Sequence, residues 1–232
     1  MVDGSDQAEE IASEEKKYYA LVKRVFHLLA PIYDAATFFI SGLRNRVVDF
    51  TNADKKSLIL DACTGTGKQA FAYAKRGYQT IGVDLSKDMI KVAHKENKFE
   101  TASFGIADVT NLPFEDDCFD VSCVSLALHD MFWTIRERAV RDIVRVTKPK
   151  GTIIVVDYAL PENRIRRFFT YRFVRIYEGE YYSTFIKSDF EALLRKSGIE
   201  IEEETRPVLG AVRIIKGLKR NSVDLSMRHR LL

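Results

Sequence analysis

The sequence predicts an α/β fold, a doubly wound and mostly parallel seven-stranded sheet, with a helical N-terminal cap and a helical insertion before the last helix and strands. Short apolar runs alternate with stretches of helical periodicity through residues 53–160 and again through 187–218. Several of these runs are almost continuously apolar, which is typical of parallel strands that helices cover on both faces. The chain has 232 residues, of which 46% are hydrophobic, enough for the core of one domain with additions.

Composition and charge exclude several classes of protein. Lys and Arg total 36 against 33 Asp and Glu, and so small a surplus does not by itself indicate a nucleic-acid partner. Cys63, Cys118 and Cys123 form neither a disulfide framework nor a metal-binding cluster, so we expect no metal and a reducing compartment. The acidic start is the reverse of a signal peptide, and the apolar stretch 25–40 is too short and too interrupted to span a bilayer. We therefore expect a cytoplasmic protein that can also contact the inner membrane surface.

Three parts follow one another along the chain. Residues 1–52 combine an acidic lead with a helical cap or lid, because their apolar side chains recur at helical spacing. Residues 53–218 form the main domain, which a basic and aromatic insertion at 161–186 interrupts, and residues 219–232 form a basic tail. We expect strands at 57–62, 78–84, 101–106, 119–128, 151–157, 199–205 and 211–215. We expect helices at 68–75, 86–97, 133–147 and 188–196.

Two strand ends carry the first sign of a ligand. The first strand ends in Asp61 and leads into Gly65-Thr66-Gly67 at the start of a helix. Glycines there let a ligand approach the backbone, and the helix N-terminus offers free N–H groups. The second strand ends in Asp84, whose carboxylate suits the two hydroxyls of a ribose. Because both points lie at the carboxyl edge of the sheet, together they indicate an adenosine-type cofactor.

The glycine pattern alone also fits a dinucleotide-binding loop, so a nicotinamide cofactor is an alternative. Asp61 argues against it, because a carboxylate at that strand end would repel a pyrophosphate and attract the ammonium of an amino acid. Asp108, after the third strand, can accept a hydrogen bond from the exocyclic amine of adenine. These two acids favour an adenosine cofactor that carries an amino-acid group.

In combination, four runs resemble a known family. They are LDACTGTG, GVDLSKDMIKVAHK, IADVTNLPFEDDCFDVSCVSLALH and RVTKPKG. The chain resembles the class I S-adenosylmethionine-dependent methyltransferases, and most of all the ubiquinone/menaquinone-biosynthesis type, over about residues 30–205. The resemblance implies a Rossmann-like methyltransferase fold, S-adenosyl-L-methionine as cofactor and S-adenosyl-L-homocysteine as product.

The same resemblance assigns roles to individual residues. Asp61 would lie near the methionine ammonium, Asp84 would accept the ribose hydroxyls, and Asp108 would bind the adenine amine. The other expected cofactor-binding residues are Ala62, Cys63, Thr64, Gly65 and Gly67 in the loop, Leu85, Met89 and Val109 around the adenine, and Ser125, Leu126 and Ala127 along the methionine arm. Tyr33 resembles the lid tyrosine that closes over the cofactor, and we count it among both the catalytic and the cofactor-binding residues.

The sequence also departs from the family pattern. Cys63 stands where the loop usually has its first glycine, and we expect an ordinary backbone conformation there because a left-handed one is unfavourable for other residues. After the fourth strand, His129-Asp130 replaces the Arg-Asn pair that is usual in the quinone type. The methyl acceptor therefore stays open between a quinone precursor, a lipid and a related metabolite.

His129 and the insertion have two interpretations each. His129 is a candidate general base and substrate contact, since an imidazole suits proton removal near neutral pH, or else it caps a helix or bonds to the lid. Residues 164–177 interleave five arginines with aromatic side chains. They form either a surface for an anionic head group or membrane, or an amphipathic helix whose aromatic side chains pack over the site. The expected substrate contacts near the insertion's end are Tyr177, Glu178, Tyr181 and Tyr182.

These observations predict an enzyme that transfers a methyl group from S-adenosylmethionine to a small, lipophilic acceptor. We expect a small-molecule partner, no nucleic acid, peripheral membrane contact through residues 164–177, and a monomer or homodimer. A non-catalytic binding protein of the same fold at a membrane surface is the alternative, and a nicotinamide-dependent oxidoreductase is a less favoured one.

Overall fold

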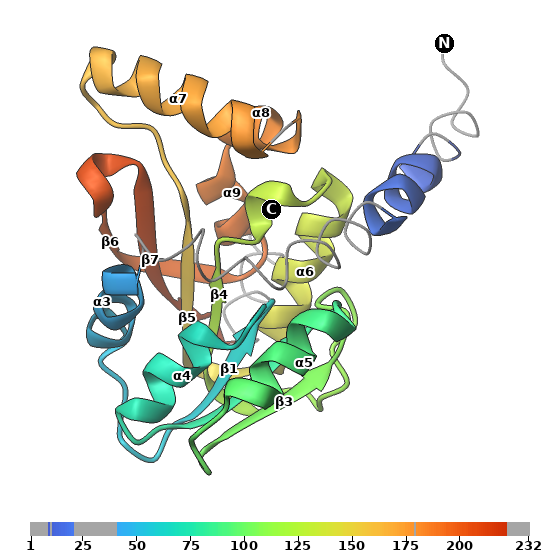
Figure 1. Cartoon of the computed structure of the whole chain (residues 1–232), viewed down its shortest axis with the longest axis vertical. Helices are drawn as coiled ribbons and strands as arrows, with labels where there is room; N and C mark the ends of the chain where they lie inside the picture. The colour runs from blue at the N-terminus through green and yellow to red at the C-terminus, as the bar shows by residue number, and fades with distance from the viewer. Residues whose placement is uncertain (1–8, 10, 21–40, 179, 222–232) are drawn as a thin grey trace, which may run out of the picture.

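A computed structural model describes residues 9, 11–20, 41–178 and 180–221, and the side chains of all of these except 41 and 176–180. Its centre is a seven-stranded sheet in the order β3-β2-β1-β4-β5-β7-β6, with β7 antiparallel to both of its neighbours and the remaining pairs parallel (Figure 1). The strands are β1 (Leu58–Ala62), β2 (Gln79–Asp84), β3 (Ala102–Ile106), β4 (Phe119–Ser125), β5 (Thr147–Tyr158), β6 (Ile199–Thr205) and β7 (Val212–Lys219). The predicted doubly wound, mostly parallel sheet is confirmed.

Helices cover both faces of the sheet. They are α3 (Ser41–Thr51), α4 (Lys68–Lys75), α5 (Lys87–Glu96), α6 (Trp133–Val146), α7 (Arg164–Glu178), α8 (Glu180–Lys187) and α9 (Phe190–Lys196), and residues 11–20 are helical as well. Short 3₁₀ turns stand at η2 (Leu128–Asp130) and η3 (Val208–Gly210). The expected boundaries between cap, main domain and tail remain a prediction.

Strand β5 shows how the sheet separates two cores. Ile153 and Val155 pack with α6 and α9, while Ile154 and Val156 pack with α3 and α4 on the other face. Successive side chains of a strand point to opposite faces, so a strand that is apolar throughout can fill both cores. Burial on both faces fixes the register of the central strands, and with it the position of their carboxyl ends.

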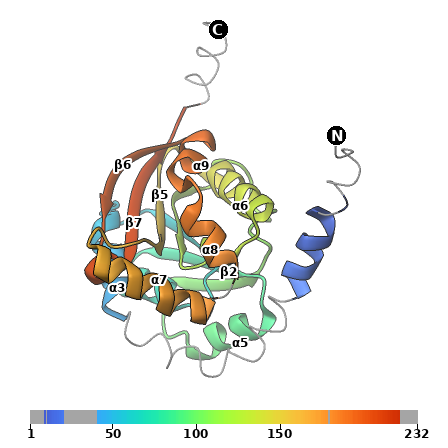
Figure 2. The same cartoon turned by 90° about the horizontal axis from the view of Figure 1, so that it is seen from above.

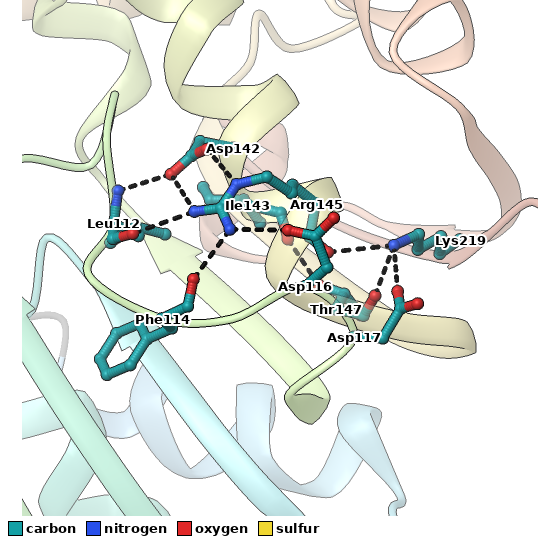
Figure 3. Close-up of polar contacts among 9 residues, drawn as sticks. All are labelled: Leu112, Phe114, Asp116, Asp117, Asp142, Ile143, Arg145, Thr147 and Lys219. Atoms are coloured by element: carbon teal, nitrogen blue, oxygen red, sulfur yellow. Dashed lines mark hydrogen bonds and ion pairs between the residues drawn. The ribbon is translucent and has the colours of Figure 1, made fainter.

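The loop from β3 to β4 is held at its far end by Arg145. The Arg145 guanidinium donates to the carboxylates of Asp142 and Asp116 and to the carbonyls of Leu112 and Phe114 (Figure 3). These carboxylates raise the Arg145 pKa above its usual value. The cluster also contains the Lys219 ammonium, which donates to Asp117 and to the carbonyls of Arg145 and Thr147. Charge-assisted bonds of this kind are stronger than neutral ones, so they fix the loop that begins next to Asp108.

The insertion is helical, as predicted, and it consists of two helices, α7 and α8. Figures 1 and 2 show α7 at the periphery, with α8 following at its C-terminal end. Phe168, Phe169 and Phe173 of α7 are exposed, so the expectation that the aromatic side chains of this stretch pack over the site is wrong for these three. Within the described residues, no helix combines the length and the apolar character needed to cross a membrane.

Candidate functional site

Two adjoining cavities lie at the carboxyl ends of β1, β2 and β4. Their volumes are about 470 and about 720 Å³, and both are lined by Cys63, Ser125 and Leu126. Asp61 borders the smaller cavity, whereas Asp84 and Asp108 border the larger one. The strand ends that the sequence singled out therefore converge on one hollow region.

Asp61 is a buried carboxyl group at the end of β1. Its Oδ2 accepts a hydrogen bond of 2.5 Å from the Thr64 hydroxyl. Burial raises the pKa of Asp61 to about 7, bonds from Thr64 and the Ala70 backbone oppose that rise, and the Asp84 carboxylate adds to it. A buried carboxyl with so high a pKa gains a cation readily, because a positive charge beside it restores the ionised form. This is the environment expected for a site that receives an ammonium group.

The loop after β1 depends on backbone conformations that favour glycine. Gly65 and Gly67 have φ of 55° and 83°, and a Cβ on Gly67 would lie 2.9 Å from the Phe104 ring. Cys63 also has a positive φ, 58°, so the expectation of an ordinary backbone conformation at Cys63 is wrong. The turn that follows Ala62 requires the left-handed region whichever residue occupies it. Backbone strain of this kind persists where the surrounding structure holds it, which is typical of binding sites.

Asp84 links this loop to the second strand. Its two carboxylate oxygens accept bonds from the backbone N–H of Gly65 at 2.9 Å and of Ser86 at 2.8 Å. Burial raises the pKa of Asp84, and these two bonds oppose the rise. An ionised carboxylate has about four acceptor positions, so two of them remain for a ligand hydroxyl.

Both carboxylate oxygens of Asp108 accept hydrogen bonds, one from Thr110 and the other from Tyr19. Oδ1 accepts from the backbone N–H of Thr110 at 2.9 Å and from its hydroxyl at 2.8 Å. Oδ2 accepts from the hydroxyl of Tyr19 at 2.9 Å. The Tyr19 hydroxyl thus bonds to the carboxylate that the resemblance assigns to the adenine amine.

The helix at residues 11–20 forms one wall of the larger cavity, which the sequence reasoning missed. Tyr18 and Tyr19 both line it. Glu15 anchors this helix to α6, since its carboxylate accepts from Thr134 at 2.5 Å and pairs with Arg138 at 2.7 Å. Helical spacing of apolar residues predicted a helix in residues 1–52, but such spacing does not indicate which surface a helix will cover.

Most of the predicted cofactor residues come together here. Those that line a cavity are Asp61, Cys63, Thr64, Asp84, Leu85, Asp108, Val109, Ser125, Leu126 and Ala127. Gly65 and Gly67 supply the backbone of the loop, whereas Ala62 and Met89 are buried and line neither cavity. Tyr33 lies outside the described residues.

His129 lies behind the cavity wall in η2. It lines neither cavity, whereas Ala127 and Asp130 on either side of it line the larger one. Its Nδ1 is 2.8 Å from Oδ1 of Asp157, its backbone N–H donates to Oδ2 of the same carboxylate, and its ring packs on Tyr158. This position suits a residue that fixes the turn after β4, and the role of His129 as a base remains a prediction.

The predicted acceptor contacts divide between the insertion's two helices. Tyr181 makes edge contacts with Tyr18 and Phe132, at ring distances of 6.2 and 6.4 Å, and so stands next to the cavity wall. Tyr182 is wholly buried and packs against Tyr158 instead. Tyr177 and Glu178 form the last turn of α7, and their side chains are outside the described set.

Comparison with known proteins agrees with this geometry. Residues 60–155 match the family model Methyltransf_11, described as "Methyltransferase domain". A demethylmenaquinone methyltransferase of Paenarthrobacter aurescens is 31% identical over 145 residues, which cover 60% of this chain and 56% of that relative. A 2-phytyl-1,4-naphtoquinone methyltransferase of Trichormus variabilis is 28% identical over 64% of this chain and 69% of its own length. The chain thus spans little more than half of the first of these relatives.

A solved structure supports the fold. The YcgJ protein of Bacillus subtilis has a TM-score of 0.61 and 20% identity, over 80% of this chain and all of that one. The resemblance to class I S-adenosylmethionine-dependent methyltransferases of the ubiquinone and menaquinone type, predicted from four sequence runs, is therefore confirmed. The matched residues run from within β1 to within β5.

Proposed function

We propose that this protein is an S-adenosylmethionine-dependent methyltransferase that acts on a small, lipophilic acceptor. One observation carries the proposal: Asp61, Asp84 and Asp108 stand at or just beyond the ends of successive strands and line two adjoining cavities. Their chemistry matches three groups of the cofactor in order, an ammonium, a ribose diol and an adenine amine. A dinucleotide fits less well, because its pyrophosphate would face the Asp61 carboxyl.

The residues of the site have distinct tasks. Asp61 binds the ammonium and, with its pKa near 7, gives up its proton when that cation arrives. Asp84 orients the ribose while its bonds to Gly65 and Ser86 hold the loop in place. Asp108 accepts a hydrogen bond from the exocyclic amine of adenine. S-adenosylmethionine, when bound, supplies an activated methyl group, so proximity and orientation are the chain's main contribution to the rate.

The walls of the larger cavity suit an apolar acceptor. Met131 and Ile135 line it beside Tyr18, and α8 closes in behind through Tyr181. Such walls exclude water from the acceptor and hold it in one orientation. The named relatives act on quinones, and we extend that class here to quinone precursors, lipids and related metabolites. Tyr33 as lid, His129 as base, and a monomeric or homodimeric state belong to the same proposal.

The test is transfer of a radiolabelled methyl group from S-adenosylmethionine to extracted lipids and to demethylated quinones. We expect a labelled lipophilic product and release of S-adenosylhomocysteine, both lost in Asp84→Asn. A folded protein that binds the cofactor and labels no acceptor would favour the alternative, a non-catalytic binding protein. His129→Gln separates the role of that residue: loss of rate with a changed pH profile supports a base, and an unchanged profile supports a positioning residue.

A further inference from the structure

Helix α7 presents an apolar stripe to solvent. Ile165, Phe168, Phe169 and Phe173 are 61% to 76% exposed, and they follow one another at positions i, i+3, i+4 and i+8. Residues with that spacing share one face of a helix. Large apolar side chains gathered on one exposed face mark an interaction surface, whereas single exposed ones are common.

The other face of α7 is already in use. The Tyr171 hydroxyl donates to Ser183 of α8 at 3.4 Å, and its ring packs against Tyr182 at 6.1 Å. Arg167 donates to the Pro161 carbonyl at 3.2 Å. These contacts attach the helix by the face opposite the stripe, so the side chains of the stripe are left exposed. No described part of the chain covers the stripe, so a separate molecule or a segment outside the described residues would have to do so.

Arg166 borders the stripe on one side and Arg164 and Arg175 on the other, while Arg172 stands within it, at position i+7 from Ile165. Arg164, Arg166, Arg172 and Arg175 are all exposed, and residues 164–177 contain no acidic side chain. A helix with an apolar stripe and flanking arginines is the kind that lies in the plane of a membrane interface, where anionic lipids attract its basic side chains. A second copy fits poorly, because a two-fold contact through this face would place the arginines of one helix against those of the other.

We infer that α7 docks this protein onto the surface of an anionic bilayer, with Ile165, Phe168, Phe169 and Phe173 in the boundary between head groups and acyl chains. The inference deepens the proposed function, on which its consequence for the acceptor rests. Helix α8 follows α7 directly, and its residue Tyr181 contacts Tyr18 in the wall of the larger cavity. A protein docked in this way takes up its lipophilic acceptor from the membrane.

The test is co-sedimentation of the full-length protein with phosphatidylcholine vesicles that do or do not contain phosphatidylglycerol. We expect retention only on the anionic vesicles, strong at about 0.05 M salt and weak at about 0.5 M, where the Debye length falls below about 5 Å. Phe169→Ser with Phe173→Ser should lower the partition coefficient about tenfold or more, because two large apolar side chains no longer enter the interface.

Charge controls separate specific docking from general attraction. Arg172→Glu with Arg175→Glu should abolish retention, whereas Lys87→Glu with Lys95→Glu on α5 makes the same change in net charge on another exposed surface and should leave it nearly unchanged. If both double variants lost vesicle retention equally, the inference would be overturned. It would also be overturned if the wild-type protein did not sediment with the anionic vesicles. Wild type that is a dimer, and that Phe169→Ser with Phe173→Ser turns into a monomer, would show instead that a second copy covers the stripe.

Failure of this inference is distinguishable from failure of the proposed function. Vesicle retention needs no cofactor, and cofactor binding, measured without vesicles, needs no membrane. The Phe169→Ser, Phe173→Ser variant should bind S-adenosylmethionine as wild type does, and should lose methyl transfer to vesicle-borne acceptors while keeping transfer to detergent-dispersed ones.

Discussion

Replacement of Asp61 by asparagine should make this protein more stable, and the gain should grow with pH. Burial raises the pKa of Asp61 from 3.8 to about 7 in the folded protein. At about 1.36 kcal/mol per pH unit, that difference corresponds to about 4 kcal/mol. Asparagine keeps an oxygen for the Thr64 hydroxyl and carries no charge at any pH, so it avoids this penalty.

The sign follows from proton linkage. Below the unfolded pKa, both states of wild type hold the Asp61 proton, and the group contributes nothing to the pH dependence. Between 3.8 and about 7, only the folded state still holds the proton, so the free energy of unfolding falls as pH rises. From about pH 5 to about pH 8, the advantage of Asp61→Asn over wild type should therefore widen by about 2 to 3 kcal/mol.

Urea unfolding at several pH values measures this widening, with the fluorescence of the single tryptophan, Trp133, as signal. Asp120→Asn is the matched control. Burial tends to raise the Asp120 pKa, but its bonds to Lys148 and the Leu58 backbone lower it overall, so its stabilising effect is present above its ordinary pKa and is lost only in acid. Asp120→Asn should lose stability by a constant amount over this range. An advantage of Asp61→Asn that is equally constant, or absent, would show that Asp61 stays ionised in the fold and would refute the argument.

The remaining predictions concern the loop, the scaffold and the N-terminal helix. Gly67→Ala should lower the free energy of unfolding by about 1 to 3 kcal/mol in the same assay, because the methyl would meet Phe104 and the backbone is left-handed; an unchanged midpoint would contradict this. Arg145→Ala should cost about 2 to 3 kcal/mol and weaken cofactor binding, since it frees the loop that carries Asp108; tight binding at reduced stability would show that the loop holds itself. Tyr19→Phe should tighten cofactor binding about threefold to tenfold in calorimetry, because one competing donor to Asp108 is gone, whereas weaker binding would mean that Tyr19 contacts the cofactor.

The sequence predicted the parts of the site that depend on local patterns. Strand ends at Asp61 and Asp84 followed from apolar runs, and parallel pairing then required their carboxylates to meet at one edge. The start of β5 was misplaced at residue 151, because the strand begins at Thr147, where a register shift opposite Phe119 interrupts the regular pairing. Bulges of this kind leave little trace in the alternation of side chains.

Features of the site that depend on packing between distant residues could not be predicted from the sequence. Tyr19 and Asp108 are 89 residues apart, and nothing in either local pattern indicates their hydrogen bond. The backbone at Cys63 follows from the turn between β1 and its loop, which overrides the residue's own preference. The outward face of α7 follows from its attachment to α8 through Tyr171, so its amphipathic pattern alone left the direction open.

The central claim is that the cavities bounded by Asp61, Asp84 and Asp108 bind S-adenosylmethionine. Titration calorimetry with S-adenosylmethionine and S-adenosylhomocysteine tests it most directly, with Asp84→Ala as control and NADH as competitor. We expect micromolar binding of both ligands, about a hundredfold loss of affinity in Asp84→Ala from the missing charge-assisted bonds, and no competition by NADH. Binding of NADH instead, or no binding of either ligand by a folded protein, would contradict it.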